Sequence, residues 1–112
     1  AKKNAGEKSK VVRERVMRAR KIQTERFNDV PGIHSNAQMT SKLTQTYCAL
    51  DEQCSQLLKS AMDRLNLSAR AYDRILKVSR TIADLAGSEE IKPEHLAEAI
   101  QYRSLDRENW GK

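Results

Sequence analysis

The chain has 112 residues, of which 38% are hydrophobic, 32% are charged and 4% are aromatic. This size fits one small domain and excludes a catalytic core joined to a separate cofactor domain. No stretch approaches the ~18 apolar residues that cross a bilayer, so we predict no membrane association. Two cysteines, Cys48 and Cys54, are too few for a disulfide framework and favour a cytoplasmic protein.

The positive charge is concentrated at the start of the chain. Residues 1–26 hold ten basic and three acidic residues, a net charge of +7, whereas the remaining residues sum to −1. A basic arm of this kind can attract phosphate groups or an acidic partner, and its alternative is a solvated helix face. The candidates for nucleic-acid or partner binding are Arg13, Arg15, Arg18, Arg20 and Lys21.

The first predicted element is a helix over residues 9–27. Apolar residues recur there at helical steps and form one narrow stripe, which predicts packing on a single side. The stripe consists of Val12, Val16, Ala19 and Ile22. Pro31 and Gly32 end the helix, and we predict a loop over residues 28–39.

Two shorter helices are predicted next. Thr40 or Ser41 can cap a brief helix that reaches Cys48. Asp51 can cap a second helix that ends near Leu65, with Asn66 following it.

Ser68 is suited to cap a helix from about Ala69 to Ala86, with Gly87 just after it. A wide apolar arc on this helix predicts a buried face, made of Ala71, Tyr72, Ile75, Val78, Ile82, Ala83, Leu85 and Ala86. The opposite side carries a basic stripe of Arg70, Arg74 and Lys77, flanked by Asp73, Arg80 and Asp84.

The last predicted helix begins near Pro93 and continues to about Arg103. Its apolar side is formed by Leu96, Ala97 and Ile100, and Ile91 just before it is expected to pack as an anchor. Residues 104–112 form a tail in which Trp110 either docks or frays. The fold class is therefore all-α, a single small bundle of four to five helices with its body over residues 40–103.

Several chemistries find no support in the sequence. The chain has neither a phosphate-binding glycine loop nor a paired-glycine dinucleotide fingerprint. His34 and His95 are far apart, and five residues separate the two cysteines, which is not zinc-site spacing. We therefore expect no metal, no bound cofactor and no complete active site in this chain alone.

Two long segments resemble a known family. Residues 67–87 and 91–103 are similar to the C-terminal domain of the magnesium-chelatase-like AAA+ ATPases, specifically the ComM/YifB subfamily. Upstream, Gly6-Glu7-Lys8-Ser9, the helix containing Arg13-x-Arg15-Val16, and Asn36-Ala37-Gln38-Met39 are similar to the same family in the same order. The resemblance covers residues 6–107.

The resemblance implies a helical lid that follows an N-terminal nucleotide-binding domain in a longer protein. In such ATPases the lid commonly supplies a sensor-2 arginine at the start of its third helix, and Arg70 occupies a similar place, with Arg74 and Lys77 as secondary candidates. The parent protein would then be an ATPase that uses ATP and magnesium and assembles neighbouring subunits into a ring. ComM-like members further imply DNA as a partner, in competence, branch migration and recombination.

Two alternatives stay open at this point. The chain could be an autonomous helical nucleic-acid-binding module that uses its basic arm, with an affinity that falls steeply with salt. It could also be a structural oligomerisation domain, in which case Arg70 would have no influence on ATP turnover.

Overall fold

The computed structural model describes the backbone of residues 2–110 and the side chains of residues 9–102. Five α-helices and one short 3-10 helix follow one another, and no strand occurs among the described residues. They are α1 (Lys2–Arg26), η1 (Asn36–Gln38), α2 (Ser41–Tyr47), α3 (Glu52–Leu65), α4 (Ala69–Leu85) and α5 (Pro93–Trp110). The predicted all-α fold is confirmed.

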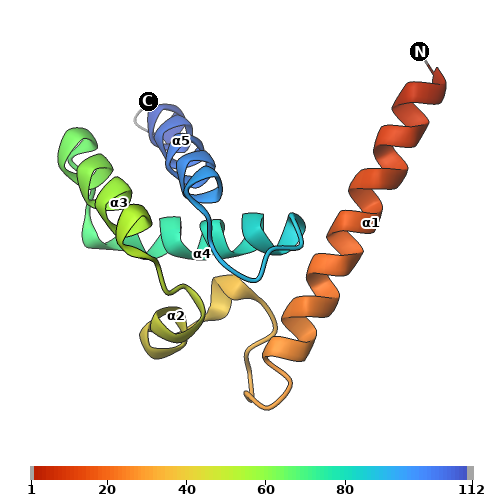
Figure 1. Ribbon diagram of the computed structural model, residues 1–112, viewed down its shortest axis with the longest axis horizontal. Coiled ribbons are helices and arrows are strands. Elements are labelled where there is room, and N and C mark those ends of the chain that lie inside the picture. Colours follow the sequence, from red (N-terminus) through yellow and green to blue (C-terminus); the bar gives the residue numbers. More distant parts are fainter. Residues whose placement is uncertain (1, 111–112) are drawn as a thin grey trace.

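Helix α4 is the central element (Figure 1). Helices α3 and α5 lie on one side of it and α2 on the other, while α1 rises from the end of α4 that is distant from α3. Since α4 has 17 residues, its two ends lie about 25 Å apart.

The helix starts follow from side-chain caps that the sequence predicted. The Thr40 hydroxyl accepts from the backbone N–H of Leu43 at 3.3 Å, and the Asp51 carboxylate accepts from that of Cys54 at 2.8 Å. The Ser68 hydroxyl accepts from the backbone N–H of Ala71 at 3.2 Å. Each cap satisfies a donor that has no partner within its own helix.

The helix ends are also set locally. Asn66 has φ 51° at the end of α3, and Gly87 has φ 72° just after α4. Both residue types tolerate this left-handed conformation, so the two predicted stops are confirmed.

The outermost helices are longer than expected. Helix α1 already includes Lys2 instead of starting near residue 9, and α5 extends to Trp110 instead of ending near Arg103. The Trp110 side chain, for which docking or fraying was expected, lies outside the described side chains.

The core lies between α3, α4 and α5 and reaches the start of the loop after α1. It includes Leu58, Ile75 and Leu96, each at most 1% exposed, and Ile91, which confirms the predicted anchor. Five residues of the predicted apolar faces are nevertheless exposed: Val12 and Val16 on α1, Tyr72 and Ala86 at the ends of α4, and Ala97 on α5. The predicted apolar arc reflects the position of a residue around the helix axis but not its position along the axis. It therefore includes Tyr72 and Ala86, which lie near the ends of α4. On α5, Ala99 is buried in place of Ala97.

None of the helices is both long and apolar enough to cross a membrane, as far as the structure describes the chain. Within the same residues, no three metal-ligating side chains come together.

Candidate functional site

Arg70 lies in the first turn of α4, two residues after the Ser68 cap, and its side chain is exposed. The first turn of a helix has free N–H groups and the positive end of the helix dipole, which favour an anion. A guanidinium beside them can bind phosphate oxygens with two hydrogen bonds. This end of α4 is therefore suited to contact one phosphate group.

The other two cations of the predicted stripe are less available. The Lys77 ammonium is 2.9 Å from the Asp73 carboxylate, one helical turn earlier, so its charge is partly compensated. Arg74 shares the face of Arg70 and is exposed, and it also has a partner within the protein. Arg70 thus stays the principal candidate for a phosphate contact.

The basic residues of α1 lie at the other end of the molecule. Helix α1 packs against the C-terminal half of α4, whereas Arg70 is at the start of α4 (Figure 1). The two predicted sets of cations are therefore not brought together, and one phosphate group cannot contact both.

The five candidates on α1 are all exposed but point in different directions. Arg15 lines a groove between α1 and α5. Arg18 reaches the C-terminal end of α4, where its guanidinium would be 3.9 Å from a Cβ added at Gly87. Arg13, Arg20 and Lys21 lie roughly 100° to 160° around the helix axis from Ala19, which is buried against the body. These three belong to the outer side of α1.

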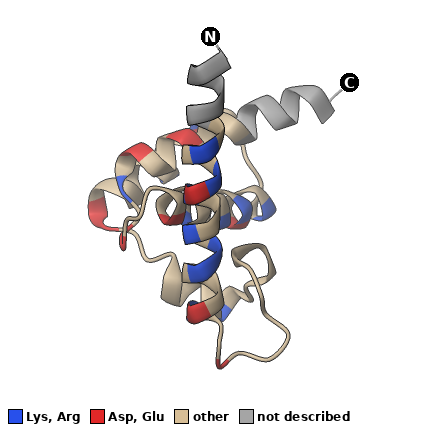
Figure 2. Cartoon of the chain, turned by 90° about the vertical axis from the view of Figure 1, so that its right-hand side faces the viewer, with Lys and Arg blue, Asp and Glu red and all other residues tan. Residues whose placement is uncertain are grey.

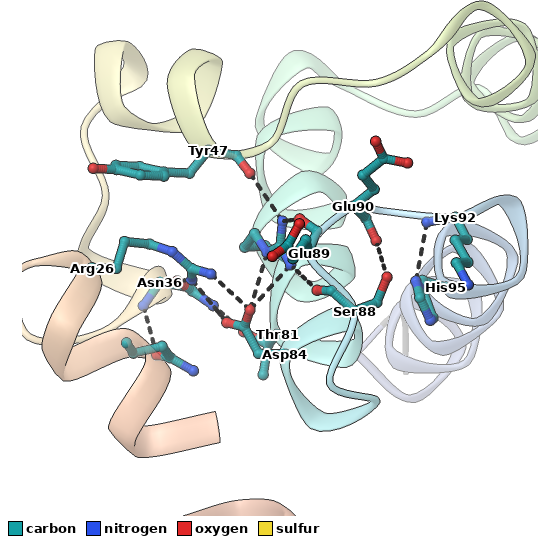
Figure 3. A network of polar contacts seen from close by, with 12 residues as sticks. Arg26, Asn36, Tyr47, Thr81, Asp84, Ser88, Glu89, Glu90, Lys92 and His95 are labelled. Atoms are coloured by element: carbon teal, nitrogen blue, oxygen red, sulfur yellow. Dashed lines mark hydrogen bonds and ion pairs between the residues drawn. The ribbon is translucent and has the colours of Figure 1, made fainter. Parts of the chain in front are cut away.

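A buried polar network joins α1 to α4, and sequence reasoning missed it (Figure 3). The two terminal nitrogens of Arg26 donate to the two carboxylate oxygens of Asp84, each at 2.8 Å. The Asn36 amide accepts from Arg26 at 2.8 Å and donates to Asp84 at 2.9 Å. Arg80 donates to the same carboxylate at 3.2 Å.

Arg80 extends the network to the loop before α5. Its guanidinium donates to the backbone carbonyls of Ser88 at 2.7 Å and Glu89 at 2.8 Å. With Arg80 at 4% and Asp84 at 1% exposure, both are buried, contrary to their expected place beside an exposed stripe. The reason is tertiary, because the end of α1 and η1 cover this half of α4. Arg80 and Asp84 have a structural role, since their hydrogen-bond partners lie within the protein itself.

The two thiols are buried and inert. Burial raises the pKa of Cys48 to about 11, although the positive charge of Arg80 opposes that shift. Burial, helped by Asp51, raises the pKa of Cys54 to about 11. Since the thiolate is the reactive form, neither side chain suits nucleophilic or metal chemistry near neutral pH.

Residues 6–103 match the family described as magnesium chelatase, subunit ChlI C-terminal. The chain belongs to this family, so it is a C-terminal domain of the magnesium-chelatase-like class. It is 47% identical over 102 residues to the competence protein ComM of Haemophilus influenzae, and 41% identical over the same length to the uncharacterised protein YifB of Escherichia coli. These matches cover 91% of this chain and 19% of each relative.

A more distant relative is an uncharacterised protein of Mycobacterium tuberculosis, 33% identical over 98 residues, or 88% of this chain and 19% of the relative. The chain thus spans about a fifth of the length of the relatives that it matches. The predicted membership of the ComM/YifB subfamily is confirmed.

Proposed function

We propose that this chain is the lid of a magnesium-chelatase-like AAA+ ATPase and follows an N-terminal nucleotide-binding domain. The family match over residues 6–103 carries the proposal, together with relatives that are about five times longer than the matched segment. In this proposal Arg70 is the sensor-2 arginine and contacts the γ-phosphate of ATP held by the preceding domain.

The geometry at Arg70 supports that role. A γ-phosphate beside the start of α4 would meet a free guanidinium and the positive end of the helix. Charge that develops on the transferred phosphoryl group is stabilised by such fixed donors. The preceding domain would hold the nucleotide and its magnesium ion, which assists phosphoryl transfer when bound, and Arg70 would add one contact to the γ-phosphate.

Three preparations test the lid assignment by their ATP turnover: the parent protein, the parent truncated before this chain, and this chain alone. We expect turnover by the parent, a loss of at least tenfold on truncation, and none by the chain alone. The proposal would be wrong if the truncated parent is folded and still hydrolyses ATP at the full rate. Circular dichroism and size-exclusion chromatography of the truncated parent show whether it is folded.

The parent is further proposed to form a ring of like subunits that remodels DNA in branch migration and recombination. The support is kinship with a relative named as a competence protein, together with the charge of α1.

The outer side of α1 is suited to contact a DNA backbone. Figure 2 shows how basic residues recur along this helix, with acidic ones between them. Four exposed cations lie there, and none forms an ion pair with another described residue: Lys10, Arg13, Arg20 and Lys21. One acidic residue, Glu14, lies among them. Exposed cations without partners can exchange counterions for phosphates.

Duplex binding by this chain is therefore expected to weaken steeply with salt, with a slope of log K against log salt of about −3 to −4 for four phosphate contacts. Arg13→Ala combined with Arg20→Ala should reduce the slope by about 2. Arg15→Ala is the matched control, since Arg15 faces the groove, and it should leave the slope unchanged. Fluorescence anisotropy across a salt series measures these slopes, and equal slopes in all three proteins would contradict the assignment.

A further inference from the structure

Helix α1 exposes more apolar surface than a solvated helix needs. Val12 and Val16, which lie about 40° apart around the helix axis, are 56% and 36% exposed. Most of the neighbouring residues of this helix are charged or polar, so Val12 and Val16 stand out as uncovered apolar side chains on one side of it. Contiguous exposed apolar surface commonly marks an interaction site.

Val12 and Val16 belong to a groove between α1 and α5. One pocket of about 510 Å³ lies between these helices above the end of α4, and Ile82 and Leu85 form part of its lining. A second pocket of about 450 Å³ adjoins it along α4 and extends to Val78 and Tyr102. The two share Ile82, Leu85 and Glu98 and form one surface, the α1–α5 groove.

The two walls of the α1–α5 groove differ in charge. The α5 wall carries Glu94 and Glu98, one turn apart and exposed, whereas the α1 wall carries Arg15. None of these three forms an ion pair with another described residue. An occupant with apolar side chains toward α4, basic ones toward α5 and an acidic one toward α1 would match both walls.

His95 provides a directional contact in the same pocket. It is 6% exposed, and its Nδ1 accepts from the backbone N–H of Lys92 at 3.0 Å (Figure 3). In the neutral ring this bond leaves the proton on Nε2, which becomes a donor. Nε2 has no acceptor within the part of the chain that the structure describes. A buried donor without a partner favours an occupant that brings an acceptor.

We infer that the α1–α5 groove is the docking surface for the residues that precede this chain in the parent protein. The inference rests on the proposed function, in which a nucleotide-binding domain lies immediately upstream. It assigns the contact to one surface: Val12 and Val16 pack against that domain, Glu94 and Glu98 face basic groups, and His95 Nε2 donates to an acceptor.

The position of α1 favours this occupant over a second copy of the chain. Helix α1 is itself one wall of the groove, and its free end points away from the body (Figure 1). A polypeptide that continues from this end is held beside the groove at a high effective concentration. Docking then needs no association between separate molecules.

Thiol labelling tests the inference in the parent protein and in this chain alone. Val12→Cys and Ala86→Cys place an accessible thiol on two sides of the pocket, and N-ethylmaleimide labelling of each peptide is followed by mass spectrometry. Both thiols should react at least tenfold more slowly in the parent. Lys10→Cys, on the outer side of α1, is the matched control and should react equally in both. Cys48 and Cys54 should stay unlabelled.

The outcomes separate this inference from the lid assignment. Equal rates at residues 12 and 86 in both proteins would overturn the docking surface, even if Arg70 controls ATP turnover. Protection in the parent without any effect of Arg70→Ala would support the surface and reject the sensor role. Protection that grows with concentration in this chain alone would identify a second copy as the occupant and overturn the inference. Two labelled positions guard against one variant that fails to fold.

Discussion

Asp84→Asn is expected to lower the free energy of unfolding by about 3–5 kcal/mol, the typical cost of breaking a buried ion pair. The Asp84 carboxylate receives hydrogen bonds from Arg26, Arg80 and Asn36, and its side chain is 1% exposed. Asparagine keeps the size but leaves two guanidinium groups without their counter-charge. Urea unfolding followed by circular dichroism measures the loss.

Asp73→Asn is the matched control for that substitution. It removes a carboxylate from the same helix. The Asp73 side chain is 41% exposed and pairs with Lys77. Exposed pairs contribute roughly 0–1 kcal/mol, so the two variants should differ by several-fold in their effect on stability. A cost below about 1 kcal/mol for Asp84→Asn would contradict the structural role of the network.

Arg70→Ala in the parent protein is expected to reduce ATP turnover by about 10²-fold or more, the usual effect of removing one donor from a developing charge. Affinity for ADP should be unchanged, because ADP lacks the γ-phosphate that Arg70 is proposed to contact. Arg70→Lys should recover only part of the rate, since an ammonium lacks the planar pair of donors. Steady-state turnover and nucleotide titrations give these values.

Lys59→Ala is the control for Arg70→Ala. Lys59 is an exposed cation on α3, and its removal should leave turnover unchanged. The melting temperature of Arg70→Ala should also match that of the unaltered protein, because the Arg70 side chain is exposed. Unchanged turnover in Arg70→Ala would remove the sensor-2 role and favour a purely structural domain.

Sequence reasoning succeeded where short segments carry the information. Asp51 and Ser68 were predicted as caps, and Thr40 was one of two predicted alternatives with Ser41. Each of the three accepts a hydrogen bond from a backbone N–H three residues later. Asn66 and Gly87 end their helices because these residue types tolerate positive φ. The kinship of the chain was also recognisable from contiguous residues. Arg70 as a phosphate contact follows from that kinship and stays a prediction.

The tertiary structure decided which polar residues are buried and which apolar residues are not. Arg26, Asn36 and Asp84 come from three separate segments, and Asp84 is 58 positions from Arg26 and 48 from Asn36. No local pattern indicates that they meet, because charged residues are normally placed in water unless a partner arrives from elsewhere in the fold. In the same way Val12 and Val16 form a helical stripe in the sequence, yet only the packing of α1 shows that they border an open groove. Helix starts and stops depend on neighbours within a few residues, whereas burial and grooves depend on how whole helices pack.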